Sequence, residues 1–507
     1  MNGLAKRTVI VILLSLWTAC ARVDPKHDFQ RTGDMLAERT EAPEAYDPDT
    51  DAVVDARVAE ILQDGLTIDE AVQVALLTNR GFQALFSSIG ASRADVVQSG
   101  LLTNPSIGFM ARFPEGGGRS NLTLTFAQEL VDLWQIPVKR RIAEAQLEQT
   151  ILDVARSGID LAADVKKKFL QLATLERTEQ IARENLDLVK QSIEIAQARL
   201  KAGETGQIDV NLLMANEIDV QTSLLSLSRD RAVAKADLGR VLGLARWKQP
   251  WKLTTAFEPS VMELPDDPTL IVFAMCERLE ARMSAEKVRA AEAELERQYL
   301  NMFPSVSMGF EGERSERRAL PGRKIPADTG KSSLRSGKLT APDIETRGER
   351  NAARRQIIDL LLGPSLQVTL PVWDQNQAQI AKARYRAQQT RKEYEDLLDV
   401  VSAEVQSATA VLTTSVGLMR FYDDRGLPTA KQNLELARKA YEVGEQNIVA
   451  VIEAQKFLIA QRLAGVNIRR DYFVAEVELR RALGGRTPPA TATSSATTQP
   501  TDIGGAD

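Results

Sequence analysis

Leu122–Leu130, with the sequence LTLTFAQEL, alternates large apolar residues with small or polar ones. A period of two places the apolar side chains on one face of a β-strand and the polar side chains on the other. Such strands form either the wall of an outer-membrane barrel or a soluble antiparallel sheet with one wet face. Three other runs alternate in the same way: Ser106–Phe113, Val306–Phe310 and Leu366–Val372.

The alternating runs occur in two pairs, and each pair lies inside a repeated unit. In Thr67–Gly243 the first pair lies between long helical patterns, and the same order returns in the second half of the chain. The residues before the strands repeat as well, since FPSV at 303–306 resembles NPSI at 104–107. The sequence therefore predicts two helix-strand-strand-helix repeats, residues 65–250 and 270–485, joined by a linker at residues 251–269.

The number of strands limits how they could lie in a membrane. Small barrels need about eight strands, so four cannot close one. An open sheet edge is not viable in lipid, because its backbone groups would lack hydrogen-bond partners. A membrane location therefore requires several copies of the chain to share one barrel, and three copies would supply twelve strands.

Long helical segments follow each pair of strands. Val138–Ala202 would span roughly 95 Å as one helix, far more than a helix of an ordinary globular domain. Ile208–Leu242 then turns back and closes an antiparallel hairpin. In the second repeat Gln377–Phe421 is a long helix, Gly426–Pro428 breaks it, and Ile448–Leu483 returns. We expect a mainly α chain with a small membrane β-barrel portion, in which four strands accompany long antiparallel coiled-coil-like helices.

The N-terminus has the features of a secretory signal at residues 1–19. Its apolar run, Val9–Trp17, is too short to span a bilayer. The ending LWTAC resembles a bacterial lipoprotein signal, which is cut before a cysteine that is then acylated, here Cys20. The alternative is an ordinary signal peptide that happens to contain a cysteine. Ala21 follows rather than an Asp, which favours the outer membrane over retention in the inner membrane.

The remaining segments are predicted from their composition. Residues 20–64 are polar and contain prolines, so we expect a lipidated, extended segment that wraps the body of the protein. Thr67 and Glu70 form a capping-box pattern that starts a helix. The insertion at 311–363 is rich in Arg, Lys, Ser, Gly and Pro, which predicts a long mobile loop between two strands. Residues 486–507 have the composition of a disordered tail.

Composition argues against most kinds of chemistry. The 507 residues carry a net charge of −5, which gives no reason to expect nucleic-acid binding. The one histidine, His27, makes a His-rich metal site or His-based catalysis improbable. The glycines at 116–118 join two strands and lack the context of a nucleotide loop. We therefore expect no enzyme activity, no cofactor and no metal.

Two stretches carry a resemblance to a known family. Tyr441–Gln455, with the sequence YEVGEQNIVAVIEAQ, resembles the YxxG tip of the TolC-type outer-membrane efflux proteins and the helix that follows it. Gly363–Asp374 resembles a second signature of that family. In the first repeat, Ala202–Val210 echoes the same tip. The resemblance covers about Leu66–Gly485.

The resemblance implies an assembly and a function. The family forms homotrimers with a twelve-stranded barrel in the outer membrane, continued by an α-helical tunnel through the periplasm of a Gram-negative bacterium. The helical tips form the periplasmic entrance and meet an adaptor (membrane fusion) protein, which connects to an inner-membrane transporter. The expected function is therefore a passive exit duct of a tripartite efflux system.

The resemblance also implies roles for residues at the tips. Tyr441 matches the constricting tyrosine of the family, and Glu453 stands where the family often has an Asp, whereas Ala450 lacks a second acidic residue. Asp209 and Gln446 are expected to join this periplasmic gate. Three carboxylates that converge on a pore axis would attract cations. The expected adaptor-contacting residues are Gly203, Glu204, Gly206, Gly444, Glu445 and Asn447.

Other functions remain open from the sequence. The same architecture serves type I protein secretion, and a fold does not determine a function. A lipid-anchored periplasmic coiled-coil scaffold without a pore is a further alternative, although the alternating strands argue against it. Nothing in the sequence identifies the transported substrate.

Overall fold

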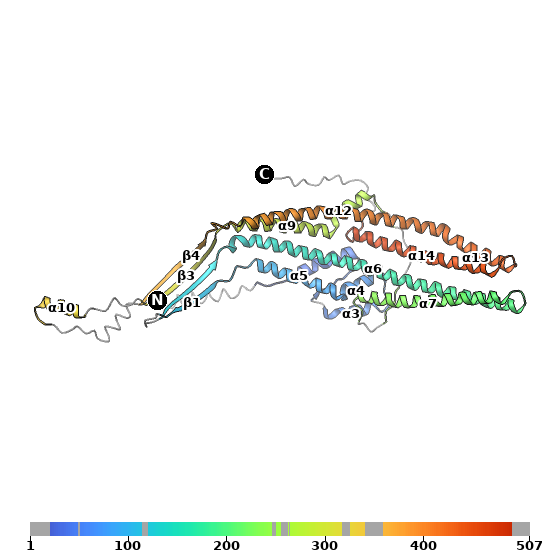
Figure 1. The fold of residues 1–507 in the computed structure, drawn as a ribbon, viewed down its shortest axis with the longest axis horizontal. Coiled ribbons are helices and arrows are strands. Elements are labelled where there is room, and N and C mark those ends of the chain that lie inside the picture. The colour runs from blue at the N-terminus through green and yellow to red at the C-terminus, as the bar shows by residue number, and fades with distance from the viewer. Residues whose placement is uncertain are drawn as a thin grey trace. The chain divides into compact units, whose positions relative to one another are not determined.

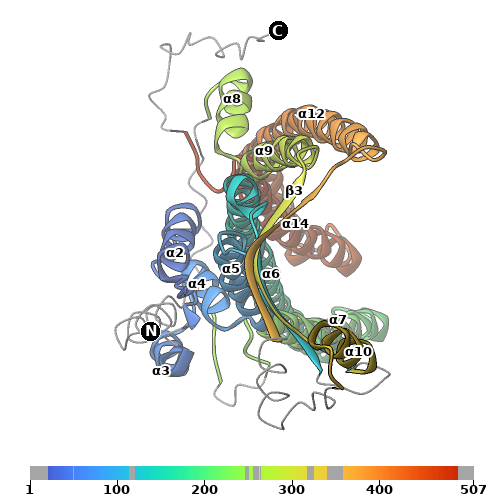
Figure 2. The same cartoon turned by 90° about the vertical axis from the view of Figure 1, so that its left-hand side faces the viewer.

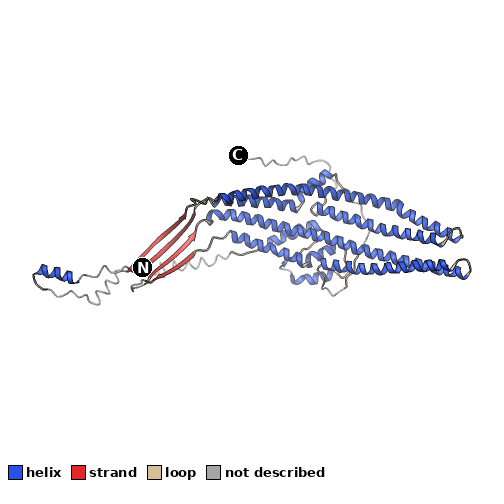
Figure 3. Ribbon diagram, viewed as in Figure 1, coloured by secondary structure: helices blue, strands red, loops and turns tan. Residues whose placement is uncertain are grey.

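The computed structural model describes residues 21–48, 51–113, 120–245, 250–254, 262, 264–316, 325–339 and 358–488. Most of these residues are helical, and four strands form one sheet (Figures 1 and 3). The chain divides into two compact units. The signal peptide with Cys20, residues 489–507 of the predicted tail and most of the predicted linker lie outside the described residues.

The sheet belongs to the unit formed by Val96–Ala143 and Ala290–Ala387. Its neighbouring strands are all antiparallel in the order β1-β2-β3-β4, and Figure 2 shows them as one curved layer. All four alternating runs predicted from the sequence contribute to strands, although Leu370–Val372 at the end of the last run lies beyond its strand. Their bounds are β1 (Ser106–Arg112), β2 (Asn121–Glu129), β3 (Ser305–Glu316) and β4 (Ile358–Thr369).

The predicted bounds of the insertion, 311–363, are wrong. Strand β3 continues to Glu316 and strand β4 begins at Ile358, so both ends of the predicted loop belong to the sheet. The two strands remain paired there, with Gly312 opposite Leu362 and Arg314 opposite Leu360. Backbone pairing with a neighbouring strand therefore extends the ladder beyond the alternating pattern. The connection between these strands contains one described helix, α10 (Ile325–Ser336).

The register places most of the large apolar residues on one face of the sheet, while Met110 and Leu361 lie on the other face in the row of Thr123. Phe126 on β2 lies opposite Ile107 on β1 and Phe310 on β3. Ile107 and Phe310 are 75% and 51% exposed, so none of the described residues covers this face. On the opposite face Thr125 pairs with Gly108 and Glu311. The sheet thus has one exposed, mainly apolar face and one face on which small and polar side chains predominate.

The helices follow the predicted repeat. Thr67 and Glu70 form the predicted capping box: the Thr67 hydroxyl accepts from the Glu70 amide at 3.3 Å, and the Glu70 carboxylate accepts from the Thr67 amide at 2.9 Å. The first repeat contains α4 (Ile68–Thr78), α5 (Arg80–Ser99), α6 (Asp132–Lys201) and α7 (Gln207–Val241). The second contains α8 (Asp267–Glu277), α9 (Leu279–Leu300), α12 (Gln377–Phe421), α13 (Leu427–Glu442) and α14 (Ile448–Ala482).

The two repeats share details that the sequence does not reveal. Asn79, between α4 and α5, and Arg278, between α8 and α9, are both extended, with ψ of 110° and 129°. A glycine after the last helix of each repeat packs against this break: Gly243, with φ +74°, and Gly484, with φ +82°. A Cβ atom on these glycines would lie 2.4 Å and 3.1 Å from the carbonyl oxygen before the break. Both repeats therefore have the same arrangement, in which a left-handed glycine packs against an extended residue between two helices.

The expectation that residues 20–64 are extended is wrong. They contain two helices, α2 (Lys26–Thr40) and α3 (Asp51–Ile61). The prolines that suggested an extended chain lie outside both helices. Phe29 on α2 is buried and stacks on Phe86 of α5, with 5.5 Å between the ring centroids. Burial of an apolar helix face therefore outweighs the polar composition of this segment.

Gly426–Pro428 does not break the helix in the second repeat. Residues Tyr422–Gly426 form a π-helical turn that leads directly from α12 into α13. The amide of Leu427 donates to the carbonyl of Tyr422, five residues earlier. Pro428 has no amide hydrogen, so it needs no acceptor in the preceding turn. The wider turn accommodates the proline, so the chain stays helical from Gln377 to Glu442.

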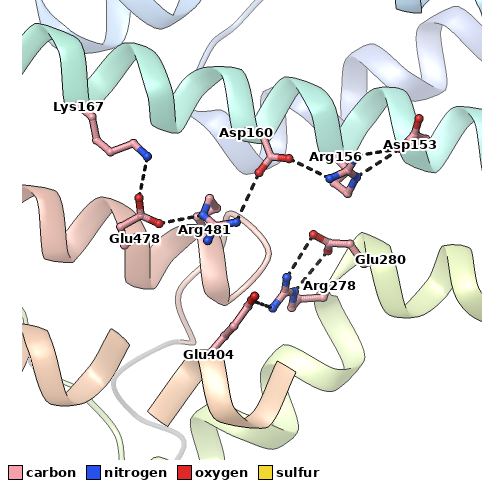
Figure 4. A network of polar contacts seen from close by, with 9 residues as sticks. All are labelled: Asp153, Arg156, Asp160, Lys167, Arg278, Glu280, Glu404, Glu478 and Arg481. Atoms are coloured by element: carbon pink, nitrogen blue, oxygen red, sulfur yellow. Dashed lines mark hydrogen bonds and ion pairs between the residues drawn. The ribbon is translucent and has the colours of Figure 1, made fainter. Parts of the chain in front are cut away.

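A network of ion pairs joins helices of the two repeats in the unit that contains α14 (Figure 4). Lys167 on α6 pairs with Glu478 on α14 at 2.7 Å. Arg481 pairs with Glu478 at 2.9 Å and with Asp160 of α6 at 3.7 Å. Burial raises the pKa of Glu478, but hydrogen bonds from Lys167 and Arg481 outweigh it and leave this pKa below its ordinary value.

Arg278, at the break between α8 and α9, makes the most buried ion pairs of Figure 4. Its side chain is 5% exposed and pairs with Glu280 at 3.2 Å and Glu404 of α12 at 2.5 Å. Burial raises the pKa of Glu280, but the hydrogen bond and the charge of Arg278 outweigh it and lower this pKa overall. The break is thus tied to α12 by charges that depend on ionised carboxylates.

Among the described residues, no helix is both long enough and apolar enough to cross a membrane.

Candidate functional site

Two helical hairpins end in turns of the same design. Helices α6 and α7 are joined at residues 202–206, and helices α13 and α14 at residues 443–447. In the first turn, the amides of Gly203 and Glu204 donate to the carbonyls of Leu200 and Arg199 at 3.0 and 2.9 Å. In the second turn, the amides of Gly444 and Glu445 donate to the carbonyls of Tyr441 and Ala440 at 3.1 and 2.9 Å. Both helices therefore end in a Schellman motif.

Glycine is required at one position in each turn. Gly203 and Gly444 both have φ +79°, in the left-handed region that other residues rarely adopt. The six residues expected to contact an adaptor are all exposed: Gly203, Glu204, Gly206, Gly444, Glu445 and Asn447. The turns thus present an open surface with fixed backbone geometry.

The helix after each turn starts differently. The side chain of Asn447 accepts a hydrogen bond from the Ala450 amide at 3.2 Å and caps α14. Gly206, at the equivalent position before α7, has no side chain to do so. In its turn the hydroxyl of Thr205 instead donates to the carboxylate of Asp209, one helical turn further on. Asp209 is therefore used to hold its own hairpin.

The two hairpins pack on each other through an apolar cluster. Residues from α6, α7, α13 and α14 all contribute, so the two hairpins form one four-helix group near their turns. The buried members are Val189, Ile193, Ala196, Val210, Leu213, Ala430, Leu434, Ile448, Val451, Ile452 and Leu458. Tyr441 is partly buried against this cluster.

Arg199 connects the hairpins at their ends. Its guanidinium lies over the ring of Tyr441, with 4.6 Å between Cζ and the ring centroid. Its Nη1 is 3.5 Å from the Tyr441 carbonyl, and its Nε pairs with Glu204 at 3.3 Å. Arg199 cannot be recognised from the sequence, because an arginine in the last turn of a helix usually serves the helix C-terminus alone.

The predicted gate residues are not brought together within one chain. No hydrogen bond joins any two of Tyr441, Glu453, Asp209 and Gln446 in the part of the chain that the structure describes. Gln446 is exposed, and its amide donates to the Ala440 carbonyl at 3.2 Å. Glu453 is exposed on α14. The hydroxyl of Tyr441 is buried and has no hydrogen-bond partner among the described residues.

A groove of about 430 Å³ lies between the two hairpins next to Tyr441. Its lining includes two cations, Arg199 and Arg438, and two anions, Glu204 and Glu442. The remaining lining residues are Leu188, Gln191, Ser192, Ile195, Tyr441, Ile448 and Val451. Such a groove suits an amphipathic helix with charges of both signs.

Among the described residues, no group of three or more His, Cys, Asp or Glu side chains could hold a metal ion.

Comparison with known proteins agrees with this geometry. A family model described as outer membrane efflux protein matches residues 71–244 and 274–485, which are the two repeats. The cobalt-zinc-cadmium resistance protein CzcC of Cupriavidus metallidurans is 21% identical over 424 residues, covering 83% of this chain and 90% of that protein. The probable outer membrane lipoprotein SilC of Salmonella typhimurium is 20% identical, covering 85% of this chain and 86% of that protein.

Solved structures share the fold. Crystal structures of CusC, reported with its folding and transmembrane channel formation, superpose with a TM-score of 0.65 at 18% identity. That likeness covers 83% of this chain and 92% of CusC.

Proposed function

The chain belongs to the outer membrane efflux protein family, and on that premise we propose that it is the tip-gated outer-membrane exit duct of a tripartite efflux system. Substrates would pass from an inner-membrane pump and a periplasmic adaptor through the helical tunnel to the exterior. The chain itself would catalyse no reaction and use no cofactor.

The observation that carries this proposal is the two-faced sheet. Its apolar face is exposed over all four strands, for example at Phe109 (70%), Leu124 (56%), Met308 (54%) and Leu366 (66%). A soluble protein rarely leaves so large a contiguous apolar surface in water. Lipid against this face, and water against the face of Thr125 and Glu311, would suit both sets of side chains.

The edges of the sheet support a homotrimer. Strands β1 and β4 are the outer strands, so each has one side without a partner within this sheet. Unpaired strand edges are too costly in lipid to persist. Three copies would pair β1 of one chain with β4 of the next and close twelve strands into a barrel.

The gate is proposed at the paired hairpins. Arg199 on Tyr441 would hold the hairpin ends together in each chain. On assembly the Tyr441 hydroxyl, which is buried in the single chain, would turn outward to a partner in the neighbouring chain. Glu453 would supply one carboxylate per chain to the pore axis. Asp209 and Gln446 would act by fixing the two turns. Opening is then a two-state change, biased by contacts with the adaptor.

The surroundings of the duct follow from the same premise. We propose that Cys20 is acylated and anchors the mature chain in the outer membrane, as the lipoprotein-like signal indicates. The exposed tip residues and the groove beside Tyr441 would receive the adaptor. The relatives with named substrates differ from this chain in four residues of five, so they do not identify its substrate.

Single-channel recording in planar bilayers tests the proposal. Purified full-length protein should be trimeric by light scattering and give small, cation-selective openings. Glu453→Gln should lower the cation selectivity without changing the number of channels that insert. Monomers in detergent with no conductance at any voltage would rule out the duct and favour the periplasmic scaffold. Trimers that conduct but whose selectivity ignores Glu453→Gln would retain the duct and reject the acidic ring.

A further inference from the structure

Helix α10 lies in the connection between β3 and β4 and has an unusual exposed face. Lys331, Leu334 and Arg335 are three and four positions apart, so they share one side of the helix. All three are exposed, and Leu334 is 86% exposed. Ser332 and Ser336 lie on the other side of the helix. A large apolar side chain is thus exposed beside two cations.

The same combination continues beyond the helix. Gly337, with φ +64°, ends α10 in the left-handed conformation. Lys338 and Leu339 follow and are exposed, and the apolar side chain of Leu339 is fully exposed. Alternating cations and exposed leucines are typical of segments that lie at a membrane surface.

The charge of this connection differs from that of the chain. Residues 317–357 contain eleven Lys and Arg but four Asp and Glu, whereas the whole chain has a net charge of −5. A basic segment in an acidic protein indicates an anionic partner. Because the partner must also accept exposed leucines, a free anion fits less well than an anionic lipid surface.

The position of α10 in the chain agrees with such a surface, provided that the proposed function holds. Strand β3 starts next to α9 and ends at Glu316, and its twelve residues can cross a bilayer when tilted. Helix α10 begins nine positions later, at Ile325, within about 30 Å of that end. Helix α10 therefore follows the end of β3 that faces the outer leaflet of the membrane. In Gram-negative bacteria this leaflet carries phosphate-bearing glycolipids.

We propose that α10 is an interfacial helix that binds the phosphate-bearing glycolipids of the outer leaflet. Lys331, Arg335 and Lys338 pair with the phosphates, while Leu334 and Leu339 enter the boundary between headgroups and acyl chains.

Hydrogen–deuterium exchange of the full-length protein in nanodiscs tests this proposal. The discs contain phosphatidylcholine alone or phosphatidylcholine with diphosphorylated lipid A. Amides of residues 325–339 should exchange about tenfold or more slowly when lipid A is present. The combined variant Lys331→Gln, Arg335→Gln and Lys338→Gln should lose this protection. A control variant, Lys190→Gln with Lys431→Gln on exposed positions of α6 and α13, should retain it.

Three results would overturn the proposal. Equal protection in both kinds of disc would mean that α10 packs on the protein. Protection produced by millimolar inorganic phosphate in discs without lipid A would mean an ion site. Protection that persists in the triple variant would mean that the three cations do not bind the lipid phosphates. Single-channel conductance of the same preparations separates these outcomes from a failure of the proposed duct, since an unprotected α10 in a conducting trimer rejects only the lipid contact.

Discussion

Arg199, in the last turn of α6, stacks on Tyr441, in the last turn of α13, with 4.6 Å between the guanidinium carbon and the ring centroid. The two residues end equivalent helices in the two repeats, so the repeats contact each other where each one turns back. Arg199 also pairs with Glu204 of its own turn. One side chain thereby couples both turns, and any separation of the hairpins must break its contacts.

Replacement of Arg199 by alanine should favour the open channel. A cation–π contact at an exposed site contributes about 0.5–1 kcal/mol, which corresponds to about a two- to fivefold shift in the closed–open equilibrium. Open probability in planar bilayers measures this shift. Lys201→Ala, two residues further along α6 and exposed, is the matched control. If Lys201→Ala opened the channel equally, loss of positive charge would explain the effect and the stacking would not.

Removal of the Tyr441 hydroxyl distinguishes contacts within one chain from contacts between chains. This hydroxyl is buried without a partner among the described residues, so Tyr441→Phe should change the stability of the detergent-dissociated chain by less than about 0.5 kcal/mol. In the assembled trimer the same change should raise open probability, because the proposed bond to the neighbouring chain is lost. Thermal unfolding and conductance together measure both effects. Unchanged conductance would remove this hydroxyl from the gate.

The strands and hairpins could be predicted because their signals are local. A period of two identifies a strand from about six residues, and Gly203 and Gly444 mark turns that need a left-handed residue. Helix α7 was expected at 208–242 and runs from Gln207 to Val241. Each of these features depends on neighbours in the sequence.

The features that sequence analysis missed depend on distant residues. Arg199 and Tyr441 are 242 positions apart, and no local pattern pairs them. The helix α2 forms because Phe29 packs on Phe86, although its composition is polar. The π-helical turn before Pro428 is held by Tyr422, whose hydroxyl donates to the Gln461 carbonyl of α14 at 2.5 Å. Tertiary contacts decide all three.

Gly465 should tolerate no larger residue because of that same tyrosine. A Cβ atom there would lie 2.5 Å from Cε1 and 2.6 Å from the hydroxyl of Tyr422. Gly465→Ala should therefore destabilise the protein by about 1–3 kcal/mol, as overpacking does. Gly417→Ala, at an exposed site in α12 with no atom within 4 Å of the new Cβ, should stabilise by about 0.5–1 kcal/mol. Denaturant unfolding compares the two, and equal effects would contradict the packing argument.

Acid should weaken the ion-pair network of Figure 4. The pKa values of Glu280 and Glu478 are lowered in the folded chain from an ordinary value of 4.5. Their contribution to stability is therefore present above about pH 4.5 and is lost as the pH falls through the lowered pKa values. The unfolding temperature should drop less on acidification in the variant Glu280→Gln with Glu478→Gln than in the natural chain.

Glu435 provides the control for this pH effect. Its pKa is also lowered, by the hydrogen bond and then the charge of Lys439, but the pair is exposed on α13. Solvent screens such pairs, so Glu435→Gln should leave the acid dependence of unfolding nearly unchanged. If Glu435→Gln reduced the acid dependence as much as Glu280→Gln with Glu478→Gln does, general charge repulsion would be the cause, and the network would have no special role.

The exposed apolar face of the sheet should be the part of the molecule most sensitive to charge. Phe126 lies at its centre, opposite Ile107 and Phe310, and Thr123 lies on the polar face of the same strand. Phe126→Arg should cost about 2–4 kcal/mol near the bilayer midplane, whereas Thr123→Arg should cost little if its face meets water. Flotation of the refolded protein with lipid vesicles measures insertion of each variant. If both variants inserted equally well, the apolar face would not meet lipid, and a second sheet or another protein would have to cover it. If Thr123→Arg also blocked insertion, the polar face would be packed rather than wet, and the barrel would enclose no duct.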